Sequence, residues 1–354
     1  MKVMADKIAS STRNAKIPSE LTLSSEIVSK EGYVIAGKLL TERGDYNTIE
    51  LVSGRMSRLY KSDIIVGVLG PRNALKGFSG IVPESLAPGD VIQLLNLGGV
   101  LGKCTSENAE LGRPIDVEVL GAVQHFPSFQ HRVGKPASIH LGEIRPLETL
   151  TSAPPLIVIS GTCMDAGKTR AACELVKHIS RAGKKVAAAK LTGVSLMRDT
   201  LAMADCGASQ VLNFTDAGVV TSTPDNALTA AKGVIQALAA NSPDCIVLEL
   251  GDGIMGEYGT MSLLSDSELM SFAKAHVLSA NDPVGAWGAV TYLGGLPANH
   301  PCPPIDIICG PSTDNDVGKT FIRSKLKVKA ANAIRDGKEL ASVVFERVFG
   351  VPLP

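Results

Sequence analysis

The sequence lacks an excess of charge of either sign and lacks any long apolar run. Its 35 basic and 35 acidic side chains cancel, so no net field would draw the protein to DNA, RNA or an anionic membrane. No apolar stretch approaches the roughly 18 residues of a membrane-spanning helix. The first thirty residues have no signal-peptide core. We therefore expect a cytoplasmic protein without nucleic-acid or membrane partners.

Closely paired cysteines are also missing. The seven cysteines are an odd number and form no Cys-x-x-Cys pair, which argues against a disulfide framework and against a structural zinc site. We expect all of them to be reduced thiols.

What the sequence does contain is a glycine-bounded loop at residues 161–169, Gly-Thr-Cys-Met-Asp-Ala-Gly-Lys-Thr. It joins the apolar run 156–159 to a segment with helical periodicity. The alternative is a chance Gly-Lys-Thr in a surface turn, which these flanking segments do not favour. Backbone N–H groups at such a helix start bind phosphates, while Lys168 adds charge and the Thr169 hydroxyl can bind magnesium. We expect a nucleoside triphosphate or a similar polyphosphate to bind Gly161, Thr162, Asp165, Ala166, Gly167, Lys168, Thr169 and Arg170.

The length of this loop resembles one enzyme family. Five residues separate Gly161 from Gly167, where the common pattern has four. The dethiobiotin synthetases have the same gap in their Gly-Thr-x-Thr-x-x-Gly-Lys-Thr loop. Lys190, in Ala-Lys-Leu-Thr-Gly, is similar to the lysine of their Lys-Pro-x-x-(Ser/Thr)-Gly segment. The alternative for Lys190 is a solvated lysine at a strand end.

The resemblance, over residues 155–354, implies an ATP- and Mg²⁺-dependent enzyme. It implies that Lys190 and Thr192 face the transferred phosphoryl group together with Lys168. Cys163 and Met164 replace the aspartate and the threonine that the family has at these positions, so the identity of the substrate is not implied.

Acidic residues follow the predicted strands, at the edge where open α/β sheets bind ligands. Glu249 ends the apolar run 245–249, where P-loop enzymes place an acidic residue that holds Mg²⁺ directly or through water. Asp199 resembles the second magnesium-binding aspartate of the dethiobiotin synthetases. Asp252 and Glu257, in the loop after Glu249, are alternatives to Glu249.

A second Gly-Lys-Thr lies at residues 318–320. Seven residues separate Gly310 from Gly318, too many for the same cradle of N–H groups. We interpret residues 310–320 instead as a late loop that lies against the nucleotide base, as in similar enzymes, with Asn315 supplying amide hydrogen bonds. A second phosphate site is the alternative.

The length of 354 residues and the 45% hydrophobic content predict two domains. Residues 1–30 lack periodicity and are expected to form an N-terminal arm. Short apolar stretches separated by turn residues predict a small β-rich, barrel-like domain over 31–145. Residues 155–354 alternate strands and helices, which predicts an α/β domain with a doubly wound, mostly parallel sheet of the P-loop NTPase type.

These features favour an ATP- and Mg²⁺-dependent ligase or kinase that phosphorylates or activates a small carboxylate or carbamate. One alternative is a GTPase or metallochaperone of the SIMIBI type, although the chain has no Asn-Lys-x-Asp guanine signature. Another is an acyltransferase that holds coenzyme A by its phosphates, and a further one is a nucleotide-binding module without chemistry. The partners we expect are a small-molecule substrate and a second copy of the chain in a homodimer.

Overall fold

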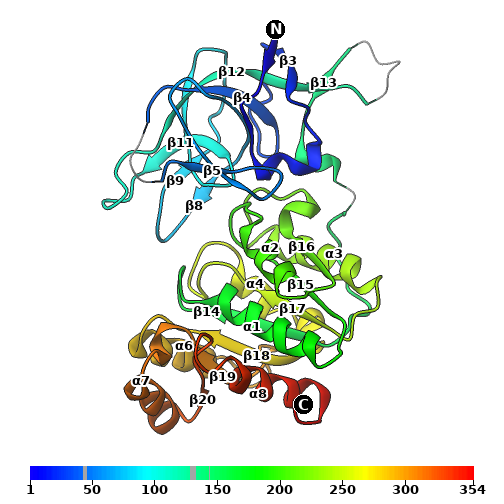
Figure 1. The fold of residues 1–354 in the computed structure, drawn as a ribbon, viewed down its shortest axis with the longest axis vertical. Coiled ribbons are helices and arrows are strands. Elements are labelled where there is room, and N and C mark those ends of the chain that lie inside the picture. The colour runs from blue at the N-terminus through cyan, green and yellow to red at the C-terminus, as the bar shows by residue number, and fades with distance from the viewer. Residues whose placement is uncertain (43–45, 128–132, 143) are drawn as a thin grey trace. The chain divides into compact units, whose positions relative to one another are not determined.

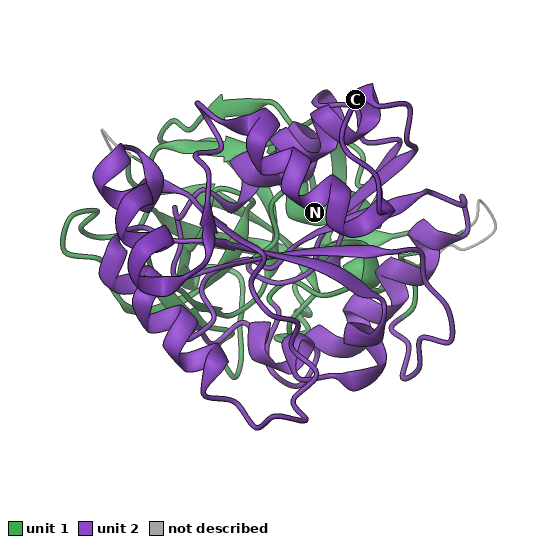
Figure 2. Cartoon of the chain, turned by 90° about the horizontal axis from the view of Figure 1, so that it is seen from below, with its two compact units in different colours: residues 1–145, 194–198, 215–221 green, residues 146–193, 199–214, 222–354 purple. Residues whose placement is uncertain are grey.

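The computed structural model describes residues 1–42, 46–127, 133–142 and 144–354, and its chain divides into two compact units. Unit 1 comprises residues 1–145, 194–198 and 215–221, and unit 2 comprises residues 146–193, 199–214 and 222–354 (Figure 2). The predicted fold class is confirmed, because unit 1 is rich in strands and unit 2 is an α/β domain with a parallel sheet (Figure 1).

Unit 1 is built around a closed ring of strands. β12 pairs with β4, β4 with β7, β7 with β11, β11 with β10, and β10 with β12 again, so these strands form a small barrel. Alternate apolar residues fill its interior, among them Ile35, Ile65 and Leu101. The ring strands are β4 (Val34–Leu39), β7 (Ile64–Leu69), β10 (Val91–Leu94), β11 (Val100–Ser106) and β12 (Asp116–His125).

Shorter elements extend the barrel. They are β1 (Lys2–Met4), β2 (Lys7–Ile8), η1 (Ser10–Ala15), β3 (Glu20–Ser24), β5 (Thr48–Glu50), β6 (Met56–Arg58), β8 (Arg72–Asn73), β9 (Ser79–Ile81), β13 (Lys135–Pro136) and η2 (Ile139–Leu141). The expectation of an N-terminal arm over residues 1–30 is wrong. β1 pairs with β3, β2 pairs with β7, and Leu21 and Leu23 are buried in the core. Strands this short carry too little periodicity to be detected in the sequence.

Two segments from the second half of the chain belong to unit 1. The Asn96 amide donates to the Ser195 carbonyl at 2.9 Å, and the buried carboxylate of Glu50 accepts from the Met197 N–H at 2.6 Å. Glu31 accepts from the backbone N–H of Thr221 at 3.2 Å. Buried polar groups of the barrel thus find backbone partners far along the sequence, so the domain boundaries, which we predicted as continuous ranges, do not describe unit 1.

Unit 2 contains one parallel sheet in the order β16-β15-β17-β14-β18-β19-β20. Its central strands are buried apolar runs, as expected for a sheet covered on both faces, and Figure 2 shows helices on either side of it. The strands are β14 (Leu156–Gly161), β15 (Val186–Lys190), β16 (Gln210–Asn213), β17 (Cys245–Glu249), β18 (Ala273–Ser279), β19 (Ile307–Cys309) and β20 (Lys329–Ala330). β16 and β20, at the two edges of the sheet, are short.

Helices α1 and α8 pack on each other and on the sheet through one apolar core, which includes Leu175, Ile179 and Phe345. The helices are α1 (Lys168–Arg181), α2 (Arg198–Asp205), α3 (Ala227–Ala239), α4 (Thr260–Leu264), α5 (Ser267–Ser271), α6 (Pro283–Gly294), α7 (Asp316–Phe321) and α8 (Gly337–Phe349), with short turns η3 (Phe214–Ala217), η4 (Pro311–Thr313) and η5 (Ile322–Leu326). Among the described residues, no helix is both long and apolar enough to cross a membrane.

Candidate functional site

The loop at residues 161–169 connects β14 to α1, as a phosphate-binding loop does. Gly161 ends the strand, and a Cβ there would lie 2.8 Å from Cδ of Lys168, so only glycine leaves room for this lysine. Asp165 and Gly167 have positive φ values of 58° and 91°, which turn the backbone sharply into the helix. The local chain therefore forms the expected cradle ahead of α1.

Lys168 lies within this loop. Its side chain is 6% exposed, and its ammonium group donates to the Cys163 carbonyl at 2.8 Å. Burial lowers the pKa of Lys168, while the negative charges of Glu249 and Asp252 act in the opposite direction. A buried cation whose described partners are one carbonyl and nearby carboxylates is suited to receive an anionic ligand.

Other predicted loop residues serve the loop itself. The Thr162 hydroxyl accepts from the Asn281 N–H at 3.2 Å, and the Asn281 amide donates to the Met164 carbonyl at 3.3 Å. Asn281, which the sequence analysis missed, thus braces the loop from just beyond β18. The position of Asn281 directly after a predicted strand is the feature of the sequence that could have identified it. Ala166 is fully buried. The Arg170 guanidinium forms an ion pair with Glu174 at 3.2 Å, one turn further along α1.

Glu249 meets the start of α1. It ends β17, the strand next to β14, and the Thr169 hydroxyl donates to its Oε1 at 3.0 Å. The Glu249 side chain is 2% exposed, and its Oε2 has no hydrogen-bond partner among the described residues. Burial raises the pKa of the Glu249 carboxyl, and the positive charges of Lys190 and Lys168 oppose this rise. Two of the three predicted magnesium ligands are therefore adjacent.

Lys190 and Asp199 complete this cluster. Lys190 ends β15, on the other side of β17, and its ammonium lies 3.7 Å from Oε1 of Glu249. It also forms an ion pair with Asp199, which lies in the first turn of α2 and is 8% exposed. The alternative of a solvated strand-end lysine does not describe this side chain, which is 14% exposed and lies near two carboxylates.

Thr192, predicted to face the transferred phosphoryl group, contacts a neighbouring loop. It is fully buried, and its hydroxyl donates to the Gly251 carbonyl at 3.0 Å. A Cβ at Gly251 would lie 2.1 Å from the Thr192 carbonyl oxygen, so the loops after β15 and β17 are in direct contact. The Thr192 hydroxyl therefore links these two loops, and its proton takes part in the hydrogen bond to Gly251.

The two alternative acids after β17 differ in burial. Glu257 is exposed, whereas Asp252 is 7% exposed and has a positive φ of 63°. The charge of Asp252 acts on Lys168, so of the two alternatives Asp252 belongs to the environment of the loop.

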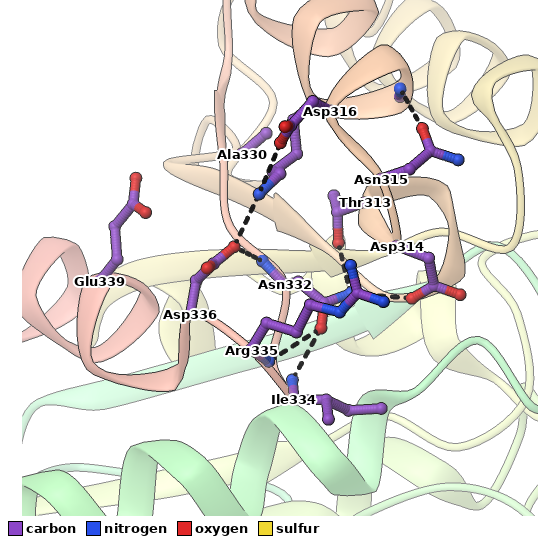
Figure 3. Close-up of polar contacts among 12 residues, drawn as sticks. Thr313, Asp314, Asn315, Asp316, Ala330, Asn332, Ile334, Arg335, Asp336 and Glu339 are labelled. Atoms are coloured by element: carbon purple, nitrogen blue, oxygen red, sulfur yellow. Dashed lines mark hydrogen bonds and ion pairs between the residues drawn. The ribbon is translucent and has the colours of Figure 1, made fainter.

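The second Gly-Lys-Thr is part of a helix. Gly318, Lys319 and Thr320 lie inside α7, and Lys319 forms ion pairs with Asp316 at 3.2 Å and with Asp336 at 3.1 Å. Two carboxylates thus already compensate the charge of this lysine (Figure 3). Asn315 caps α7, because its amide oxygen accepts from the Gly318 N–H at 3.0 Å.

The loop after β19 nevertheless contacts the phosphate loop. Gly310 has a positive φ of 90°, and a Cβ there would lie 2.3 Å from the Ala166 carbonyl oxygen. The strand order, the loop and the contacts around Glu249 together give unit 2 the architecture of a P-loop nucleotide-binding domain.

Comparison with known proteins adds distant likenesses. No family model and no curated protein matches the sequence. The chain is similar to the signal recognition particle receptor FtsY from Elizabethkingia anophelis (14% identity, 55% of this chain and 66% of that one, TM-score 0.38). It is also similar to a DUF1611 family protein from Anabaena variabilis (14% identity, 55% of this chain and 58% of that one, TM-score 0.38). A third similar structure is the 54 kDa signal recognition particle protein from Aeropyrum pernix (15% identity, 59% of this chain and 53% of that one, TM-score 0.34). The chain thus spans less than two thirds of each of these three structures, and likenesses this distant carry no argument about activity.

Proposed function

We propose that unit 2 binds a nucleoside triphosphate with Mg²⁺ and transfers its terminal phosphoryl group to a small-molecule acceptor. One observation carries this proposal. The Thr169 hydroxyl, directly after the phosphate-loop lysine, lies 3.0 Å from a buried strand-end carboxylate, Glu249. This pairing of a hydroxyl with an acid is how P-loop enzymes hold the magnesium ion of their nucleotide.

The donor set fits Mg²⁺. The Thr169 hydroxyl and the Glu249 carboxylate offer oxygen ligands, and the Asp199 carboxylate is linked to Glu249 through the Lys190 ammonium. Within the described part of the chain, no cluster of three His, Cys, Asp or Glu side chains forms a metal cage. That agrees with Mg²⁺, which takes one or two carboxylates and completes its shell with water and phosphate oxygens. When bound, Mg²⁺ would offset the charge on the transferred group.

The chain's own groups have separate tasks. Backbone N–H groups at the start of α1 hold the phosphates, and the Lys168 ammonium exchanges the Cys163 carbonyl for a phosphate oxygen. Lys190 lies on the other side of Glu249 and meets the charge that develops on the transferred group. Asp199 holds Lys190 in this position.

The acceptor class comes from the resemblance to dethiobiotin synthetases, which implies a small carboxylate or carbamate and ATP as the nucleotide. The positive charges of Lys168 and Lys190 support an anionic acceptor. The phosphate end of the site does not contact the base, so it is equally compatible with ATP and GTP.

Thermal unfolding in the presence of ATP, GTP or acetyl-CoA, each with and without Mg²⁺, tests the proposal. We expect a nucleoside triphosphate to raise the melting temperature, and more so with Mg²⁺, because ligands that bind the folded state stabilise it. Glu249→Gln should remove most of the Mg²⁺ effect and suppress phosphoryl transfer. Stabilisation by acetyl-CoA alone would instead support the acyltransferase.

A further inference from the structure

Two thiols of unit 2 lie close together behind the phosphate site. Cys173 is in α1 and is 8% exposed, and Cys206 directly follows the last residue of α2 and is partly exposed. Cys173 belongs to the apolar core of unit 2, and Cys206 packs against that core. The turn after α2 also touches α1 further along, because a Cβ at Gly207 would lie 2.9 Å from Oγ of Ser180. This turn therefore rests on the face of α1 on which Cys173 and Ser180 lie two turns apart.

The two thiols interact with each other. Both are free in the structure. The pKa of Cys173 is raised to about 12, first by burial and then by the charge of Cys206 and by a hydrogen bond between the two side chains. Sulfur atoms within hydrogen-bonding reach need only a small shift of side chain or helix to attain the roughly 2.0 Å of a disulfide bond.

We propose that Cys173 and Cys206 are a redox-active pair that forms a reversible disulfide when the protein meets hydrogen peroxide. The bond would join α1 and α2, whose first turns carry Lys168 and Asp199. It would thus connect the two helices that contribute side chains to the phosphate site. The inference is independent of the proposed function, because neither thiol is a predicted ligand of the nucleotide or the metal.

The difference in burial between the two thiols sets the order of the chemistry. The thiolate is the nucleophile in thiol oxidation, and burial disfavours the thiolate of Cys173. Cys206 is the more accessible, so its thiolate attacks a peroxide oxygen, the O–O bond breaks, and a sulfenic acid and water form. The Cys173 sulfur then attacks the Cys206 sulfur, the S–O bond breaks, and the leaving hydroxide takes the Cys173 proton as a second water. Two thiols are oxidised to one disulfide, and one peroxide is reduced to two waters.

Peptide mapping of the full-length protein tests this pair. The protein is treated with hydrogen peroxide, its remaining thiols are alkylated, and it is digested with trypsin without reduction. The tryptic fragments 171–177 and 199–232 contain one cysteine each, so their cross-linked product identifies the bond. We expect this product to form in the wild type and to disappear after treatment with dithiothreitol.

Cys206→Ser and Cys173→Ala should not give the cross-linked product. In Cys173→Ala, peroxide should carry Cys206 on to the sulfinic or sulfonic acid, because no second thiol traps the sulfenic acid. Cys302→Ser, which removes another partly buried thiol, is the matched control and should form the bond as the wild type does. Circular dichroism verifies that the variants fold.

Two results would overturn the inference. One is irreversible oxidation of Cys206 in the wild type without any cross-linked fragment. The other is a bond that joins two copies of the chain, which a non-reducing gel distinguishes from a bond within one chain. Because Cys206 is partly exposed, Cys206→Ser keeps the test decisive even if a substitution of the buried Cys173 impairs folding.

Discussion

At the scale of single residues, two lysines and two carboxylates compensate each other's charge at the phosphate end of the site. The charges of Lys168, at the start of α1, and of Lys190, at the end of β15, both act on Glu249, and Asp199 adds a second carboxylate. Removing any one of them leaves another charge buried without its full compensation, which is costly in a dry environment. Substitutions here should therefore change ligand binding and local stability in different proportions.

Lys168→Ala should weaken nucleotide binding by roughly 10- to 100-fold, the value of a lost charged hydrogen bond. The fold should persist, because the hydrogen bond to the Cys163 carbonyl is the only one that this ammonium forms within the described residues. Calorimetry and circular dichroism measure the two effects. Lys177→Ala, on the surface of the same helix, is the control. Unchanged affinity in Lys168→Ala would remove the phosphate cradle from the proposal.

Lys190→Ala should lower kcat by about 10²- to 10³-fold, as the loss of one group that stabilises developing charge does. Nucleotide affinity should change far less, because Lys190 acts at the transferred group. Lys185→Ala, directly before the other end of this strand, should leave kcat unchanged. Equal losses of rate and affinity would make Lys190 a general anion-binding group, and no loss would make it a purely structural partner of Asp199.

At the scale of elements, the phosphate loop is supported by two neighbouring loops. Asn281 hydrogen-bonds to it from beyond β18, and Gly310 packs against the Ala166 carbonyl from beyond β19. The geometry of the cradle therefore depends on strand-end loops that are far away in the sequence.

Gly310→Ala should destabilise the protein by about 1–3 kcal/mol, because it places a side chain at a positive φ and against a backbone oxygen. Nucleotide binding should weaken too, since the displaced atom belongs to the phosphate loop. Denaturant unfolding and calorimetry measure both effects. Gly288→Ala in α6 is the control, as an added Cβ there has no neighbour within 4 Å and should be neutral or stabilising. Equal behaviour of the two variants would contradict this packing.

At the scale of the whole molecule, a buried histidine should make stability depend on pH. His276 is fully buried, its Nδ1 donates to the Pro303 carbonyl at 3.0 Å, and its Nε2 accepts from the Ser160 hydroxyl at 2.7 Å. Burial lowers the pKa of His276, although the Pro303 carbonyl and the charge of Asp306 oppose this. The native state therefore favours the neutral ring.

The sign of the effect follows from linkage. Below the unfolded-state pKa of about 6.5, the unfolded chain binds a proton that the native state refuses, so stability should fall as pH decreases toward the native pKa. Glu249 acts in the opposite sense, because its raised pKa lets the native state take up a proton first. Denaturant midpoints of the wild type and of His276→Gln, measured between pH 8 and 5, separate the contribution of His276 from that of Glu249. The stability of the variant should no longer fall as the pH is lowered. Parallel curves would show that His276 is not its source.

The sequence by itself determined the phosphate loop, the fold class and the strand-end position of Glu249. These features depend on residues that are close together in the chain. One is a glycine-bounded turn between an apolar run and a segment of helical periodicity, and the other is an acidic residue at the end of a buried strand. The dethiobiotin synthetase resemblance also directed attention to Lys190 and Asp199, which the structure places beside Glu249.

Only the tertiary structure decided how these residues are used. Glu257 is exposed whereas Glu249 is buried. The Thr192 hydroxyl donates to the Gly251 carbonyl of a neighbouring loop, and the Asn315 side chain caps α7. Residues 1–30 form part of the barrel, which also takes in residues 194–198 and 215–221. Each of these outcomes depends on partners that are distant in sequence, which no local pattern records, because side-chain burial and hydrogen bonding are set when separate strands and loops come together.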